Sequence, residues 1–178
     1  MAIHLEAFFL STGHDFKGRY GKPRGHHGIA EPQTIQCVAG KGLAGDRYFG
    51  HKPGFKGQAT FVDRTAYQAL VHWLETEHGR DPETIPGPAG LRRNILVGGL
   101  DLNPLIGQTF ELATDGGSVR FSGSEACAPC FWMDAVFGPG TEAFLKGRGG
   151  LRVRILSDGQ LSLGPAQIRV LDKNASSA

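Results

Sequence analysis

Glycine recurs along this chain at intervals too short for many long helices. There are 27 glycines among 178 residues, about twice the roughly 7% share that is usual in proteins. Glycine reaches positive φ angles without steric cost, so it suits tight turns and weakens helix interiors. The segments between the glycines are short and rich in Val, Ile, Phe and Thr, which is typical of β-strands. We predict strands over 3–10, 34–39, 58–62, 94–97, 109–113, 118–121, 151–156, 160–163 and 167–171.

Two aspartate–glycine sequences predict hairpin turns. Asp115-Gly116-Gly117 and Asp158-Gly159 suit type I′ turns, because Asp and Gly accept positive φ angles. The segment LRVRILSDGQLSLG at 151–164 alternates apolar and polar residues, as a half-buried antiparallel strand does. We therefore predict a mainly β fold of the α+β class, a largely antiparallel β barrel or closed sheet with a few helices in its connections.

One long helix is predicted over Arg64–His78. Asp63 can cap its start and Gly79 its end. Apolar residues recur at helical spacing on one face, namely Ala66, Ala69, Leu70, Trp73 and Leu74. Shorter helices are expected over 141–145 and after Cys130.

Charge, hydropathy and cysteine number argue against several classes of protein. A formal charge of +2 and a pI of about 8.5 are too mild to indicate nucleic-acid binding. No run approaches the roughly 18 apolar residues of a membrane span, and the opening MAIHLEAFFL, broken by Glu6, does not read as a signal peptide. Three cysteines do not make a disulfide scaffold. We expect one cytoplasmic domain over 1–178 with free thiols, and neither membrane nor nucleic acid as a partner.

A basic loop rich in glycine and proline covers residues 11–33. Phe16 and Tyr20 are interleaved with its cationic side chains, which are Lys17, Arg19, Lys22, Arg24, His26 and His27. Such a segment can contact an anion or a single-stranded nucleic acid, but we predict a solvated loop. The tail at 173–178 is expected to be frayed.

The hexapeptide Gly40–Gly45 spells G-x-G-x-x-G. A dinucleotide site needs a helix to open there, so that the helix N-terminus meets the pyrophosphate. The chain instead continues DRYFGHKPGFKG, which does not suit a helix. We predict a tight turn, and a loop that binds an anion through backbone N–H groups, near Lys41 and Arg47, stays open as an alternative.

Cys127-Ala128-Pro129-Cys130 has C-x-x-C spacing. Half of a zinc site would need two further ligands with their own short spacing, and the seven histidines all precede residue 80. A thioredoxin-like dithiol would need the first cysteine to open a helix within a βαβ unit. The remaining interpretation is two small thiols packed in a core turn.

Arg92-Arg93-Asn94 stands at the start of a predicted strand. The planar guanidinium of arginine suits bidentate contact with phosphate or carboxylate. Taken alone, the segment is more typical of a solvated strand end.

Read in order, these segments resemble MOSC domains, named after the C-terminal part of molybdenum cofactor sulfurases. The resemblance covers residues 40–171 and rests on the ordered set rather than on any single motif. Its parts are GLAGDRYFG at 42–50, KGQATF at 56–61, RRNILV at 92–97, GLDLN at 99–103 with Leu105 and Gly107, Pro129-Cys130, and GGLRVRIL at 149–156. Where the family often has Gly-Asp near the end, this chain has Gly164-Pro165.

The resemblance implies a twisted antiparallel β barrel and a pocket for the molybdenum cofactor. It implies that Cys130 is the protein ligand of molybdenum or carries sulfur, and a thiolate is a soft ligand that neighbouring arginines favour. Arg92 or Arg93 would hold the phosphate of the pterin, and Asn94 would bond a polar ring edge. Cys127 could be a second reactive thiol, a neighbouring group or packing. Residues Lys41, Asp46 and Arg47 complete the expected cofactor site.

Three hypotheses for function follow. The first is an oxidoreductase that reduces N-hydroxylated or related N–O and S–O compounds at molybdenum, with electrons from a separate flavin or haem protein. The second is a carrier of sulfur or cofactor, in which Cys130 holds a persulfide from a donor enzyme. The third is a dithiol protein using Cys127 and Cys130. The resemblance does not bring a pyridoxal phosphate site, because the desulfurase domain of the sulfurases has no counterpart in this sequence.

Overall fold

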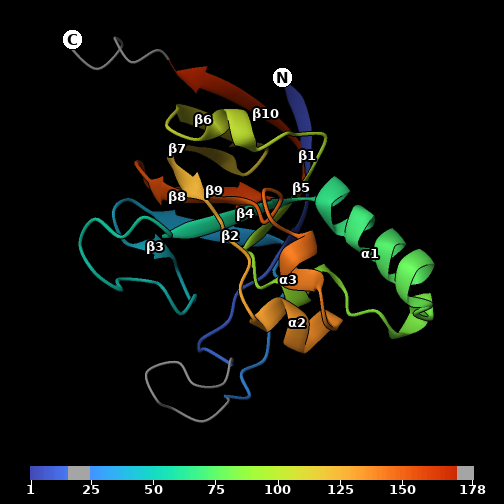
Figure 1. Cartoon of the computed structure of the whole chain (residues 1–178). Coiled ribbons are helices and arrows are strands. Elements are labelled where there is room, and N and C mark those ends of the chain that lie inside the picture. Colours follow the sequence, from blue (N-terminus) through green and yellow to red (C-terminus); the bar gives the residue numbers. More distant parts are fainter. Residues whose placement is uncertain (16–24, 172–178) are drawn as a thin grey trace.

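Seven strands close into a barrel (Figure 1) in the order β1-β10-β6-β7-β8-β4-β5. The computed structural model describes residues 1–15 and 25–171. The barrel strands are β1 (Ala2–Phe8), β4 (Ala59–Asp63), β5 (Ile95–Gly98), β6 (Thr109–Thr114), β7 (Gly117–Ala126), β8 (Leu151–Ile155) and β10 (Gly164–Leu171). The predicted mainly β barrel is confirmed.

The barrel is largely antiparallel, as predicted, and one of its strand pairs is parallel. Strand β4 pairs with β5 in parallel, with Phe61 opposite Ile95. Helix α1 (Arg64–His78) lies between these strands in the chain and carries it back to the end at which β4 began, as a parallel pair requires. The other barrel pairs are antiparallel.

A second small sheet stands beside the barrel in the order β3-β2-β9, with β2 (Thr34–Val38), β3 (Gly42–Leu43) and β9 (Gly159–Ser162). The prediction that Asp158-Gly159 forms a hairpin turn is wrong, because β9 pairs with β2 and not with β8. The Asp158 carboxylate instead accepts a hydrogen bond from the Ala39 N–H at 2.7 Å. This bond fastens the start of β9 to the end of β2.

The turn between β6 and β7 is a hairpin as predicted, but it is not of type I′. Thr114 pairs with Gly117, so Asp115 and Gly116 are the loop residues. Among the described residues, positive φ occurs at Gly117 and not at Asp115 or Gly116. The glycine after the turn, rather than the turn itself, takes up the strand twist.

The predicted helices are confirmed, and all three lie on one side of the barrel (Figure 1). Helix α1 ends at Gly79 in the left-handed conformation, where the Arg80 N–H bonds the Leu74 carbonyl. The side chain of Asp63 does not cap the backbone, because its carboxylate accepts from the Thr65 hydroxyl instead. Helices α2 (Trp132–Phe137) and α3 (Thr141–Phe144) follow Cys130, and short 3₁₀ helices cover η2 (Pro82–Thr84), η3 (Pro88–Leu91) and η4 (Asn103–Leu105).

Two apolar clusters hold these layers together. The barrel interior is filled by side chains, including Phe61, Phe110 and Phe121, whose rings meet at centroid distances of 5.5 to 6.3 Å. A second cluster packs α1 and α2 against the outside of β4 and β5, through Leu70, Leu74, Val62, Leu96, Met133 and Phe137. Because α2 is fixed there, the cysteine segment before it has a fixed place at the barrel mouth.

Parts of the sequence-based interpretation fall outside the described residues. These are the side chains of Phe16, Lys17, Arg19, Tyr20, Lys22 and Arg24, and the tail at 173–178. None of the described helices combines the length and apolar character that a membrane crossing requires.

Candidate functional site

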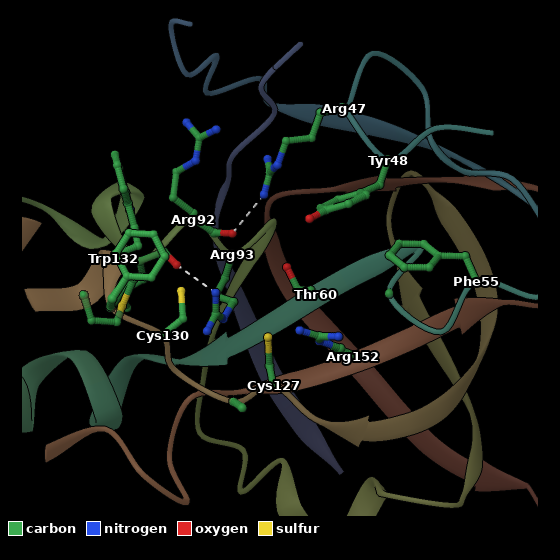
Figure 2. A pocket seen from close by; sticks show the side chains of 15 residues that line it. Arg47, Tyr48, Phe55, Thr60, Arg92, Arg93, Cys127, Cys130, Trp132 and Arg152 are labelled. Atoms are coloured by element: carbon green, nitrogen blue, oxygen red, sulfur yellow. Dashed lines mark hydrogen bonds between the residues drawn. The ribbon is translucent and has the colours of Figure 1, made fainter. Parts of the chain in front are cut away.

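A pocket of about 370 Å³ opens at the barrel mouth beside α2 (Figure 2). Five parts of the chain build it: the loop between β3 and β4, strand β4, the residues before β5, the segment from the end of β7 into α2, and β8. Its polar and reactive side chains are Arg47, Tyr48, Thr60, Arg92, Arg93, Cys127, Cys130 and Arg152, and its apolar lining includes Phe55, Leu91, Phe131, Trp132 and Met133.

Cys127 and Cys130 line this pocket in different ways. Cys127 is buried and Cys130 is exposed. The backbone of Cys127 is fixed, since its N–H bonds the Gly150 carbonyl at 2.7 Å. Both sulfur atoms point into the pocket (Figure 2). Cys37, the third thiol, lies in the barrel core, where burial raises its pKa to about 12.

The surroundings of the two thiols match neither a thioredoxin-like site nor a zinc site. Helix α2 begins at Trp132, after the second cysteine, whereas Cys127 follows directly on antiparallel strand β7. A thioredoxin-like site needs a helix that starts at the first cysteine of a βαβ unit. Within residues 1–15 and 25–171, no group of three or more His, Cys, Asp or Glu side chains could hold a metal ion.

Four arginines line the pocket, and the described part of its lining contains no carboxylate. Three of them are paired with carboxylates outside the lining: Arg47 with Asp46 at 3.3 Å, Arg92 with Asp15 at 2.9 Å, and Arg152 with Glu125 at 3.3 Å. The lining itself is therefore positive, and the carboxylates that partly neutralise it lie outside the lining.

Arg93 differs from the other three arginines. Its Nε donates to the Gly149 carbonyl at 2.8 Å and its Nη1 to the Leu91 carbonyl at 2.9 Å. In the part of the chain that the structure describes, no carboxylate forms an ion pair with it. Its charge is therefore the least neutralised in the pocket, and an anion is the partner it suits best.

Arg92 anchors the segment that precedes β2. Its Nη2 donates to the Gly13 carbonyl at 2.7 Å, and Asp15, its ion-pair partner, also accepts from the N–H and the ring of His27, both at 2.8 Å. Arg92 is the single described non-glycine residue with positive φ, at 57°. Such a backbone costs about 1–3 kcal/mol and is characteristic of functional sites. Burial and the charge of Arg47 lower the pKa of Arg92, although Asp15 and Asp46 oppose this shift.

Arg152 lies next to Cys127, and the two side chains point toward each other (Figure 2). Burial would lower the pKa of Arg152. The hydrogen bond and charge of Cys127, with the charges of Glu125 and Tyr48, outweigh burial and raise that pKa above its usual value. The guanidinium therefore stays charged beside the buried sulfur.

Three of the predicted cofactor residues do not line the pocket. Lys41 is exposed in the turn between β2 and β3. Asp46 is buried and accepts from the Tyr48 N–H and from Asn94 Nδ2, both at 3.0 Å. Asn94 is buried too, and its oxygen accepts from the N–H and hydroxyl of Thr60. The two buried residues brace the pocket from behind, and no helix follows Gly40–Gly45, as predicted.

Sequence reasoning missed several residues of the pocket. Tyr48 and Phe55 form an aromatic wall with centroids 5.1 Å apart, and Thr60 and Arg152 face the cavity from β4 and β8. The one available signal for Arg152 was its polar position in the alternating strand LRVRI. Alternation alone does not tell a ligand-facing arginine from a solvated one.

Comparison with known proteins agrees with this fold. The model of the MOSC domain matches residues 59–169. The chain belongs to the MOSC family. This family is associated with binding of the molybdenum cofactor. A search of curated protein sequences gave no match.

Solved structures share the fold of this MOSC domain. The YuaD protein of Bacillus subtilis superposes with a TM-score of 0.68 at 14% identity, over 97% of this chain and 98% of that one. YiiM of Escherichia coli superposes with a TM-score of 0.62 at 15% identity, over 97% of this chain and 71% of that one. At such identities the likeness establishes the fold alone.

The pocket of this MOSC domain has the chemistry that a phosphate-bearing metal cofactor needs. An exposed thiol supplies a soft ligand. The Nε atoms of Arg47 and Arg92 are buried with no hydrogen-bond partner in the described structure. A metal that arrives on an organic cofactor needs few ligands from the protein, which is compatible with a single exposed cysteine.

Proposed function

We propose that this pocket binds the molybdenum cofactor with Cys130 as the protein ligand, and that the protein reduces N-hydroxylated or related N–O and S–O compounds. One observation carries the proposal: an exposed thiol stands in a pocket lined by four arginines. A wall of this charge suits a ligand that is an anion and carries a soft metal.

When bound, the cofactor supplies a metal centre that can take up an oxygen atom and exchange electrons. The residues of the chain bind and orient it. Arg93, which has no carboxylate partner among the described residues, is the proposed phosphate contact, assisted by Arg47. Tyr48 and Phe55 exclude water from one side of the cavity.

The reduction needs electrons from outside this chain. We propose a separate flavin or haem protein as the electron donor and a small molecule as the substrate. Phe131, which is 53% exposed beside Cys130, leaves the pocket mouth open to both.

A turnover assay tests this proposal. Protein from a host that makes the cofactor is supplied with a reduced viologen dye and either an N-hydroxylated amidine or a dialkyl sulfoxide. We expect dye oxidation that depends on the substrate, and its loss in Cys130→Ser. Cys37→Ala, which alters a thiol in the core, is the control and should retain turnover. Equal turnover in Cys130→Ser and the parent would contradict the proposal.

The exposure of Cys130 also favours a second candidate, a carrier that holds a persulfide on this thiol. An exposed thiol can meet the sulfur of a donor enzyme directly. The carrier predicts a gain of one sulfur in mass on Cys130 after incubation with a desulfurase, reversed by a thiol reductant. A carrier would show this adduct without any substrate-dependent dye oxidation.

A further inference from the structure

Reduction of an N–O bond consumes protons, and the pocket has few groups that can deliver them. Its described lining includes no Asp, Glu or His. Thr60 is engaged, since its hydroxyl donates to Asn94 Oδ1 at 2.9 Å and accepts from the Asn94 N–H at 3.0 Å. With Cys130 assigned to the metal, Cys127 and Tyr48 remain. A free thiol has a pKa of about 8.5 and a free phenol about 10, so the thiol is the better acid near neutral pH.

The position of Cys127 suits a fixed proton donor. Its N–H bonds the Gly150 carbonyl at 2.7 Å, and its carbonyl packs so closely on Gly149 that no Cβ would fit there. The thiol is 4% exposed, yet it lines the cavity. A proton on this sulfur therefore faces the ligand space.

The guanidinium of Arg152 lies against this sulfur. A cation beside a thiol stabilises the thiolate that remains after the proton has left. The other charged groups nearby are Glu125 of β7, which pairs with both Arg152 and Lys56 at 3.3 Å, and Arg93 across the pocket. Around Cys127 the positive charges outnumber the single carboxylate.

We propose that Cys127 is the proton donor for the reduction and that Arg152 is a positioning residue, which holds the thiolate that is left. The inference rests on the proposed function. For a hydroxylamine, R–NH–OH with two electrons and two protons gives R–NH₂ and water: the N–O bond breaks, and an N–H and an O–H bond form. The external flavin or haem protein supplies both electrons. Cys127 Sγ supplies one proton and solvent the other, and solvent then restores the thiol.

The first test uses the protein without cofactor and reads thiol chemistry directly. In a Cys130→Ser background, the rate of iodoacetamide labelling of Cys127 at pH 7 is measured by mass spectrometry. Cys37 stays silent, because burial raises its pKa to about 12. Adding Arg152→Gln should slow the labelling several-fold. Arg154→Gln, two residues along the same strand at an exposed position, is the matched control and should not. Equal rates in both variants would overturn the role of Arg152.

The second test uses the loaded enzyme. Cys127→Ser should keep its molybdenum but lose about 10²- to 10⁴-fold in kcat, the usual contribution of a general acid. The alkaline limb of the pH–rate profile should move to higher pH in Arg152→Gln. A full rate in Cys127→Ser, or a larger loss in Tyr48→Phe than in Cys127→Ser, would overturn the proposal. If the parent reduces no N–O or S–O compound, the proposed function fails, and the labelling rates still report whether Arg152 stabilises the thiolate.

Discussion

Replacing Gly149 with alanine should disrupt the pocket from a position outside its lining. A Cβ at Gly149 would lie closer to the Cys127 carbonyl than the 3.0 Å that real Cβ atoms keep. The obstacle is backbone, so one of the two chain segments must move. The same residue offers its carbonyl to Arg93 Nε at 2.8 Å, and the neighbouring Gly150 carbonyl accepts the Cys127 N–H at 2.7 Å.

The magnitude follows from the bonds at risk. A hydrogen bond from a charged donor contributes about 1.5–3 kcal/mol and a neutral one about 0.5–1.5. Gly149→Ala should therefore lower the free energy of unfolding by about 2–4 kcal/mol, which corresponds to a fall in Tm of roughly 5–15 °C for a domain of this size. Urea and thermal unfolding measure both quantities.

The control for this substitution is Gly87→Ala. A Cβ at Gly87 meets nothing within 4 Å, and its φ of −61° suits alanine. We expect a change within about 0.5 kcal/mol, as for a surface site. If Gly149→Ala were as mild as Gly87→Ala, the close packing of Arg93, Gly149 and Cys127 would be refuted.

Three further predictions concern single side chains. Asp15→Asn should lower the free energy of unfolding in urea by about 1–3 kcal/mol. Burial would raise the pKa of Asp15, but the bonds from His27 and the charge of Arg92 outweigh burial and lower it below the ordinary value of 3.8. The stability that the Asp15 carboxylate contributes is therefore present above pH 3.8 and is lost as the pH falls through the lowered pKa, where mutant and parent should converge. A difference in unfolding free energy between Asp15→Asn and the parent that stays as large at pH 2 as at neutral pH would contradict this pH dependence. Cys37 should resist labelling at pH 8 until urea unfolds the barrel, and native labelling would disprove its burial. Arg93→Gln should lower the amount of cofactor that stays with the protein on gel filtration at least tenfold, whereas Arg120→Gln, at an exposed position, should not lower it. Equal amounts of bound cofactor in the two variants would show that Arg93 does not hold the cofactor.

Local patterns predicted the elements that depend on neighbours in the sequence. Helix α1 carries its own apolar face, and Gly79 ends it where expected. The pairing of β9 with β2 was not predicted, because β2 lies more than a hundred residues earlier in the chain. Asp158-Gly159 looks like a hairpin turn in isolation, and the pairing of β9 with β2 and the carboxylate bond to Ala39 show that the chain leaves β8 there.

The candidate site, like the fold, was predicted only in part. The resemblance named Arg47, Arg92, Arg93 and both cysteines, and the fold brings all of them to one pocket. It did not separate the residues that line the cavity from those that brace it. Asn94 lies behind the wall because its amide bonds the backbone of Thr60 and Phe9 and the carboxylate of Asp46, a role that depends on contacts distant in sequence.

The most direct test of the central claim is the molybdenum content of the purified protein. The parent, Cys130→Ser and Cys37→Ser would be prepared in parallel from a host that makes the cofactor and analysed for metal per chain. The account predicts near-stoichiometric molybdenum in the parent and in Cys37→Ser, and its loss in Cys130→Ser. Full molybdenum in Cys130→Ser would contradict the assignment of Cys130 as the ligand.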